Sequence, residues 1–415
     1  NVSVTDPDAG DTHTYSVDDA RFEVVGGVLR LAAGQSLDFE TEPSVSITIT
    51  ATDQGGTGLS YNETFTVTVT NVNEAPTDIA LSNSTLAENT DTTGGVAVGN
   101  LSATDVDAGD TFSYAVVGGA DAAVFSISGN QLVITDGVLD FETKNSYVVD
   151  VEVTDQGGAG LTFTRTFTIT VTNANEAPTV LTLSNSNLDE NVAAGTTVGT
   201  FGSTDPDSGD TFTYTLVAGT GDTDNAAFSI VGDQLRISAS PDFESQSSYD
   251  IRVRTTDAGG LSTEQTFTVT INDLNEAPTD IALSNSVLAD NTDTTGGVAV
   301  GNLSATDVDA GDTFSYAVVG GADAAVFSIS GNQLVITDGV LDFETKNSYV
   351  VDVEVTDQGG AGLSFIKSFT VTITNVNEAP TDLAVDNLTV AENAAGAVIG
   401  NVSVTDPDAG DTHTY

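Results

Sequence analysis

The chain has 415 residues and is strongly acidic, with 61 aspartates and glutamates against 9 lysines and arginines and a formal net charge of −52. This charge excludes electrostatic binding to nucleic acid or to an anionic membrane, and it favours cations as partners. Cysteine is absent and histidine occurs only at His13 and His413, which excludes disulfides, thiolate metal sites and most histidine-based catalysis. No run of 18 apolar residues occurs, so we expect no membrane insertion in this segment.

Internal repetition organises the sequence. Asn73, Asn175, Asn275 and Asn377 are spaced 102, 100 and 102 residues apart, so one unit of about 100 residues recurs, long enough to bury its own core. Residues 76–177 and 278–379 are almost the same sequence. The expected domains are 1–75, a partial repeat lacking its first strand; 76–177, 178–277 and 278–379, three complete repeats; and 380–415, the N-terminal part of a further repeat.

Within a unit the apolar residues alternate with polar ones. Phe167, Ile169 and Val171 lie on one face of residues 166–172 and threonines on the other, which is typical of a half-buried strand. The expected strands of the second unit, in chain order, are 79–86, 97–103, 112–117, 124–127, 131–135, 147–153 and 166–172, with a hairpin turn at 128–130. No helical stripe occurs. The pattern predicts an all-β protein, a tandem array of immunoglobulin-like Greek-key β-sandwiches.

Acidic residues recur at fixed places in every unit. In the second unit they are, in chain order, Glu88, Asp105, Asp107, Asp140, Glu142 and Asp155. Any one of these motifs is more simply a solvated turn, because aspartate and glycine favour turns. Together, so many carboxylates would repel one another unless a cation neutralised them. Clustered oxygen ligands suit a hard cation such as calcium.

A short connector joins one unit to the next. It occurs at 71–77, 172–179, 272–279 and 375–381, and each copy contains a proline, which denies the backbone a donor and ends the preceding strand. The connector offers amide, carboxylate and carbonyl oxygens, so it is expected to be a joint set by calcium.

The unit resembles a cadherin repeat, of the kind found in large bacterial surface and adhesin-like proteins. Glu88 matches the glutamate of the family's Pro-Glu-Asn motif, and residues 139–142, Leu-Asp-Phe-Glu, match its Leu-Asp-Arg-Glu motif. Asp105 and Asp107 match its Asp-x-Asp pair, and Asp155 matches its late Asp-x-Gly motif. The resemblance covers the whole chain.

The connectors match the family's Asp-x-Asn-Asp-Asn-x-Pro motif in shortened form. Residues 273–278, Asp-Leu-Asn-Glu-Ala-Pro, are the nearest match, whereas the other three connectors begin with Asn71, Asn173 and Asn375. An asparagine at this position removes one charge from the predicted ligand set and leaves an amide oxygen in its place.

The resemblance implies that up to three calcium ions lie at each joint, held by the unit before, the connector and the unit after. The joint at 173–178 would use Glu88, Asp140, Glu142, Asn173, Asn175, Glu176, Asp205, Asp207 and Asp257. The joint at 273–278 would use Glu190, Asp242, Glu244, Asp273, Asn275, Glu276, Asp307, Asp309 and Asp357.

The two outer joints are implied with incomplete sets. The first would use Asp38, Glu40, Asn71, Asn73, Glu74, Asp105, Asp107 and Asp155, without an early glutamate. The last would use Asp290, Asp342, Glu344, Asn375, Asn377, Glu378, Asp406 and Asp408, without a late aspartate. Asp6, Asp8, Asp53 and Glu392 occupy further matching positions. Asp290 is one methylene shorter than glutamate, which weakens the expectation that it binds calcium through both oxygens. Asp110 is a further candidate ligand, and its alternative role is to cap the turn.

Three functions are compatible with these features. We favour a calcium-rigidified extender of an extracellular adhesin, filament or surface matrix, self-associating with further copies. The alternative is an adhesion module that binds its own kind or a surface glycan, and residues 178–277, with the insertion-like 219–225, are where such a specialisation is expected. An enzyme is disfavoured because the Asp140 and Glu142 pair recurs in every unit instead of forming one unique cleft.

The two ends of the sequence match. Residues 401–415 repeat residues 1–15 letter for letter. We therefore expect the chain to be one 400-residue period of a longer polymer, in which residues 380–400 supply the strand that the first segment lacks.

Overall fold

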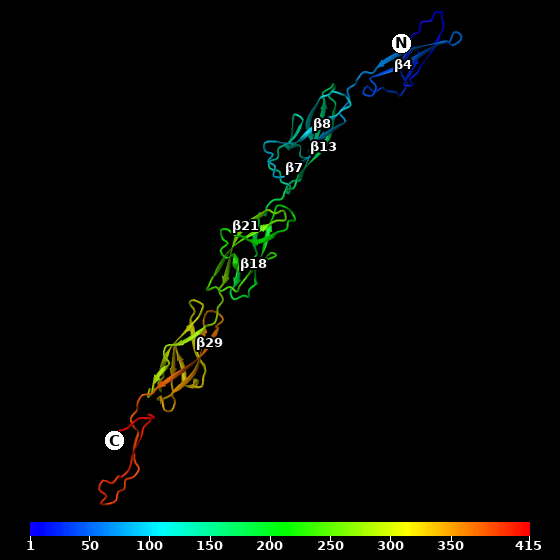
Figure 1. The fold of residues 1–415 in the computed structure, drawn as a ribbon. Coiled ribbons are helices and arrows are strands. Elements are labelled where there is room, and N and C mark those ends of the chain that lie inside the picture. Colours follow the sequence, from blue (N-terminus) through cyan, green and yellow to red (C-terminus); the bar gives the residue numbers. More distant parts are fainter. The chain divides into compact units, whose positions relative to one another are not determined.

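The computed structural model describes all 415 residues, and nearly every regular element is a β-strand (Figure 1). The only helical elements are three single turns of 3-10 helix: η1 (Ala122–Val124), η2 (Asn225–Ala227) and η3 (Ala324–Val326). No helix has the length and apolar character needed to cross a membrane. The all-β prediction is confirmed.

The segment 76–177 contains two four-stranded sheets. Its strands are β6 (Asp78–Leu81), β7 (Thr85–Ala87), β8 (Val96–Thr104), β9 (Phe112–Gly118), β10 (Phe125–Ser128), β11 (Gln131–Ile134), β12 (Ser146–Asp155) and β13 (Thr162–Thr172). One sheet has the order β10-β11-β8-β6 and the other β7-β13-β12-β9. All neighbours are antiparallel except β7 and β13, which run in the same direction.

The opening strand is divided, which corrects the single strand expected over 79–86. Its first part, β6, pairs with β8, and its second part, β7, pairs with β13 in the other sheet. Asn83 makes the crossing: its Nδ2 donates to the carbonyl oxygens of Thr85 and Val98, at 2.7 and 3.0 Å. A Cβ at Gly99 would lie 2.8 Å from the backbone nitrogen of Asn83, so the crossing also needs a glycine on β8.

The core of this segment lies between the two sheets. Val149, Val151 and Val153 of β12 and Ile169 of β13 are fully buried, and Leu132 of β11 faces them from the other sheet. The intervening residues of β12 and β13 are more exposed, as the alternation predicts. Burial of this apolar surface stabilises the segment without a disulfide.

The next two segments repeat the arrangement. In 178–277 the strands are β14 (Val180–Leu183), β15 (Asn187–Asp189), β16 (Thr197–Thr204), β17 (Thr213–Leu216), β18 (Phe228–Val231), β19 (Gln234–Ile237), β20 (Ser248–Thr256) and β21 (Ser262–Asn272). In 278–379 they are β22 (Asp280–Leu283), β23 (Val287–Ala289), β24 (Val298–Thr306), β25 (Phe314–Gly320), β26 (Phe327–Ser330), β27 (Gln333–Ile336), β28 (Ser348–Asp357) and β29 (Ser364–Thr374). Each segment has two four-stranded sheets and one parallel pair, β15 with β21 and β23 with β29.

The first and last segments contain fewer strands. Residues 1–75 form β1 (His13–Val17), β2 (Phe22–Val25), β3 (Val28–Leu31), β4 (Ser44–Asp53) and β5 (Ser60–Thr68), arranged as sheets β1-β4-β5 and β2-β3. Their buried core is small: Phe22, Val45, Ile47 and Ile49. Residues 380–415 contain only the pair β30 (Asp382–Val385) and β31 (Val402–Thr405).

Candidate metal centres at the connectors

The connectors are extended backbone tied to the loop that carries the Asp-x-Asp pair. At 71–76, both oxygens of the buried Asp107 accept hydrogen bonds from the connector: Oδ1 from Asn71 Nδ2 at 2.9 Å and Oδ2 from the Glu74 backbone N–H at 2.7 Å. Asp207 receives the same two bonds from Asn173 and Glu176, at 2.7 and 2.8 Å. The aspartate therefore fixes where the connector lies against that loop.

The early glutamate ties the other side of the connector. Glu190 is 1% exposed, and its Oε2 accepts the Phe243 N–H at 2.8 Å while its Oε1 accepts the Leu274 N–H at 2.7 Å. Glu88 bridges the N–H groups of Phe141 and Ala174 in the same manner. One carboxylate thus holds the connector to the loop that carries the Asp-Phe-Glu motif.

Asp290 does not make this bridge. Its Oδ1 accepts the N–H groups of Asn291 and Phe343, at 2.8 and 3.0 Å, and its Oδ2 is buried without a hydrogen-bond partner. The shorter side chain therefore keeps the bond to the Phe343 loop and loses the bond to the connector.

Two of the late aspartates are the most deeply buried acidic residues. Asp155 and Asp357 are both 0% exposed. Asn73 Nδ2 donates to Asp155 Oδ2, and Asn275 Nδ2 donates to Asp357 Oδ2 at 3.2 Å. These two connector asparagines thereby contact the segments that follow them.

Many buried oxygens at these places have no hydrogen-bond partner. They include Asp105 Oδ2, Asp110 Oδ2, Glu176 Oε2, Asp205 Oδ2, Asn275 Oδ1, Glu276 Oε2, Asp307 Oδ2, Asp309 Oδ1, Asp312 Oδ2, Asp357 Oδ1 and Glu378 Oε2. A buried carboxylate oxygen without a partner is costly, because burial removes water and nothing replaces it. These residues therefore fit a hard divalent cation, which takes oxygen ligands from carboxylates and amides.

The predicted ligands also gather in groups small enough for one ion. Three such groups, each with its ligand atoms within 4.8 Å of one another, are Glu40, Glu74 and Asp107; Glu88, Asp140 and Glu142; and Asp105, Asp110 and Asp155. The last group shows that Asp110 lies close to Asp105 and Asp155, where it could bind an ion as well as cap the turn.

Electrostatic strain accompanies this crowding. Burial, reinforced by the neighbouring carboxylates of Glu88 and Asp207, raises the pKa of Glu142 and of Glu176. Burial also raises the pKa of Glu276, with Glu190 and Asp309 as charged neighbours. A cation at these places would favour the ionised forms and remove the repulsion.

Some predicted ligands also have local roles. Asp140 accepts the Thr143 N–H at 2.9 Å and the Thr143 hydroxyl at 2.8 Å, so it caps its own turn. Asp257 accepts the Leu261 N–H at 2.9 Å. Glu392 is exposed and is not brought to any of these groups.

The sequence reasoning missed the asparagine that follows the early acidic residue. Asn89, Asn191 and Asn291 have φ of 61–62°, in the left-handed region that asparagine tolerates better than most residues. Asn89 Nδ2 donates to Glu176 Oε1 at 2.7 Å, and the other two donate to Glu276 and Glu378. Its recurrence after each early acidic residue was the available signal.

Comparison with known proteins gives a consistent result. The sequence model of the cadherin domain matches residues 83–172, 184–272 and 291–374. Protocadherin Fat 4 of Mus musculus is 30% identical over 300 residues, which cover 69% of this chain and 6% of that protein. Protocadherin Fat 1 of Homo sapiens is 26% identical over 328 residues, covering 75% and 7%. The chain therefore spans less than a tenth of the length of these two relatives.

Solved structures share the fold. The Protocadherin GammaB4 extracellular domain matches with a TM-score of 0.63 and 24% identity, covering 96% of this chain and 66% of that one. Mouse Cadherin-23 EC22-24 matches with a TM-score of 0.52 and 18% identity, covering 71% and 96%.

Proposed function

Because this chain belongs to the cadherin family, we propose that it is a calcium-rigidified repeat array that extends an extracellular adhesin, filament or surface matrix. One observation carries the proposal: buried carboxylate and amide oxygens without hydrogen-bond partners gather at the connectors. Calcium would satisfy these oxygens and neutralise the charge that they concentrate. The relatives named above come from mouse and human, so they do not support a bacterial source.

We assign the ions to the ligand sets predicted from the sequence, with the repeat boundaries 1–75, 76–177, 178–277, 278–379 and 380–415. One group supports this assignment: Glu40 of the Asp-Phe-Glu motif, Glu74 of the connector and Asp107 of the following Asp-x-Asp loop bring their oxygens within 4.8 Å of one another. An ion held by such a group would oppose bending of the connector, because bending would pull ligands away from it.

Adhesion through one specialised repeat is the second candidate. The observation that favours it is the distinct surface of 178–277, where Arg252 contacts both Glu264, at 2.7 Å, and the carbonyl of Thr220 in the inserted loop. Arg254 also pairs with Glu264, so this chain of only 9 basic residues places two of them side by side here. A binder should depend on this repeat, whereas an extender should tolerate its replacement by residues 278–379.

Small-angle scattering with and without calcium tests the extender. Adding millimolar calcium to the full chain should lengthen its maximum dimension and reduce its flexibility, and a chelator should reverse the change. Circular dichroism in the chelator should show that the sheets persist, since their cores do not depend on the ion. An unchanged maximum dimension would overturn the proposal.

A further inference from the structure

The first segment differs from the complete ones at a position beside its acidic loop. His13 opens β1, directly opposite Asp53 on β4. The corresponding residues Phe112 and Phe314 stand opposite Asp155 and Asp357 in the same register. Those phenylalanines pack against the apolar cores of their segments.

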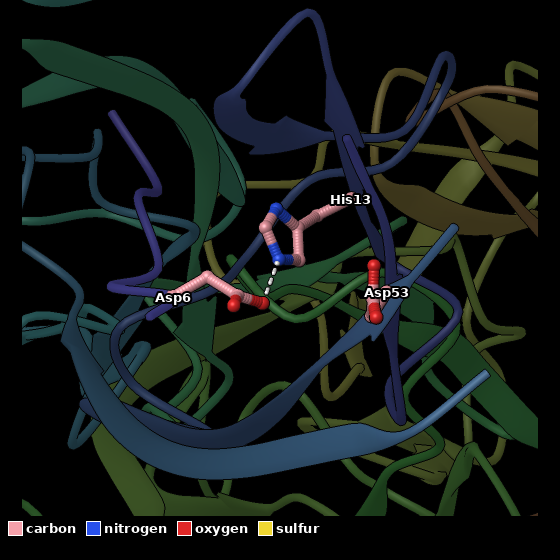
Figure 2. Close-up of side chains that lie close together, drawn as sticks. All are labelled: Asp6, His13 and Asp53. Carbon is pink, nitrogen blue, oxygen red and sulfur yellow. Dashed lines mark hydrogen bonds and ion pairs between the residues drawn. The ribbon is translucent and has the colours of Figure 1, made fainter. Parts of the chain in front are cut away.

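The imidazole faces the carboxylates instead. His13 Nε2 lies 3.0 Å from Asp6 Oδ2, and the two side chains are only 13% and 22% exposed. Figure 2 shows the ring directed at Asp6, with Asp53 beside them on the adjacent strand. One ligand atom from each of Asp6, His13 and Asp53 lies within 4.8 Å of the others.

These spacings are close to those of a zinc site. Two ligand atoms bound tetrahedrally to one zinc ion at roughly 2.0–2.1 Å lie about 3.3 Å apart. The His13 and Asp6 atoms, at 3.0 Å, nearly meet this spacing. The Asp53 atom exceeds it by at most about 1.5 Å, which a side-chain rotation can provide.

The nitrogen donor decides the class of ion. Calcium takes oxygen ligands almost exclusively, whereas imidazole suits zinc, copper and nickel. Three protein ligands of the His and carboxylate type leave a fourth position for water, an arrangement common for zinc. We propose that Asp6, His13 and Asp53 form a binding site for a divalent transition-metal ion of the zinc class.

The site is distinct from the calcium sets of the complete repeats. Asp6 and Asp53 occupy positions that the family resemblance assigns to calcium, but the equivalents of His13 at positions 112, 212 and 314 are phenylalanines that offer no ligand atom. The exchange of one aromatic residue thus gives this segment a different metal preference. The inference does not require calcium to bind at the connectors.

Titration of the full chain with zinc ions alone, in a large excess of calcium, tests the site. Calorimetry should find one tight zinc site, and the ring signals of His13 in NMR should shift as it fills. In His13→Phe the affinity at this site should fall by about 100-fold, the upper end of the loss seen when even a supporting group around a metal is removed. The substitution introduces the residue that the other repeats carry, so thermal unfolding should show that the fold is kept.

Two further variants control the experiment. His413→Phe should leave the zinc affinity unchanged, because this sequence contains no counterpart of Asp53 after residue 413. Asp53→Asn should lower the affinity while His13 keeps its place. Equal zinc affinity in the wild type and His13→Phe, or unshifted His13 signals, would overturn the site. Because calcium stays in excess, failure here would leave the scattering result on the connectors unaffected.

Discussion

Two repeats differ in the length of their early acidic side chain. The repeat before the connector at 273–278 carries Glu190, and the repeat before the connector at 375–380 carries Asp290, which is one methylene group shorter. Glu190 reaches both the Phe243 and the Leu274 N–H groups, at 2.8 and 2.7 Å. Asp290 reaches the Phe343 N–H at 3.0 Å but turns back to its own neighbour, Asn291, at 2.8 Å. The loop contact survives the shortening, and the connector contact does not.

A natural control supports this interpretation. Residues 76–177 and 278–379 are nearly identical, yet Glu88 bridges to the Ala174 N–H whereas Asp290 makes no such bond. The core residues of the two segments are buried to almost the same degree. Side-chain length, not the surrounding fold, therefore decides whether this acidic residue reaches the connector backbone.

The largest effect is expected from removing the bridging glutamate. Glu190→Ala deletes a proposed calcium ligand and leaves two N–H groups without their acceptor, so calcium affinity at the joint near Asn275 should fall by about 100-fold or more. Asp290→Ala should cause a smaller loss of calcium affinity at its own joint, because Asp290 does not bond the connector backbone. Calorimetric titration of both variants measures the difference, and equal losses would contradict the comparison.

Restoring the methylene should sharpen the comparison in the opposite direction. Asp290→Glu should rebuild the bridge to the Val376 N–H and raise calcium affinity at the last joint by about 10-fold, or roughly 1.4 kcal/mol. Val287→Thr, another of the differences between the two near-identical repeats and located in the same repeat as Asp290, should leave affinity unchanged and serves as the matched control. A calorimetric gain no larger in Asp290→Glu than in the control would show that side-chain length is not the cause.

The smallest effect concerns the asparagine beside the glutamate. Asn191 has φ of 61° and donates to Glu276. Asn191→Gly keeps this backbone conformation at little steric cost and removes only the donor, so calcium affinity should fall modestly while stability is nearly unchanged. Asn191→Ala should also lower the free energy of unfolding by about 1 kcal/mol, because alanine resists positive φ. Chemical denaturation distinguishes the two, and identical stabilities would contradict a backbone role.

More of the fold than of the candidate sites could be predicted from the sequence. Alternation in 166–172 predicts β13, and the hairpin turn at Gly129 was readable from its neighbours, because these signals are local. The division of the opening strand was not readable, since it depends on Asn83 bonding to Val98 on another strand.

For the candidate sites, repetition within the chain identified the acidic positions, but not their partners. The bond from Asn89 to Glu176 spans 87 residues, and only the fold brings the two together. His13 attracted attention in the sequence only as a residue that occurs twice. Its position opposite Asp53 became visible once the register of β1 and β4 was known.

The parallel pair in each complete segment has a mechanical consequence. Strand β15, near the start of its segment, lies beside β21, at the end, with Asn187, Leu188 and Asp189 opposite Thr270, Ile271 and Asn272. Tension applied at both ends of the segment pulls these two strands in opposite directions along their length. Their hydrogen bonds are then sheared all together and not peeled apart one by one. In each complete repeat, the parallel strand pair therefore resists tension applied between the two ends of the repeat.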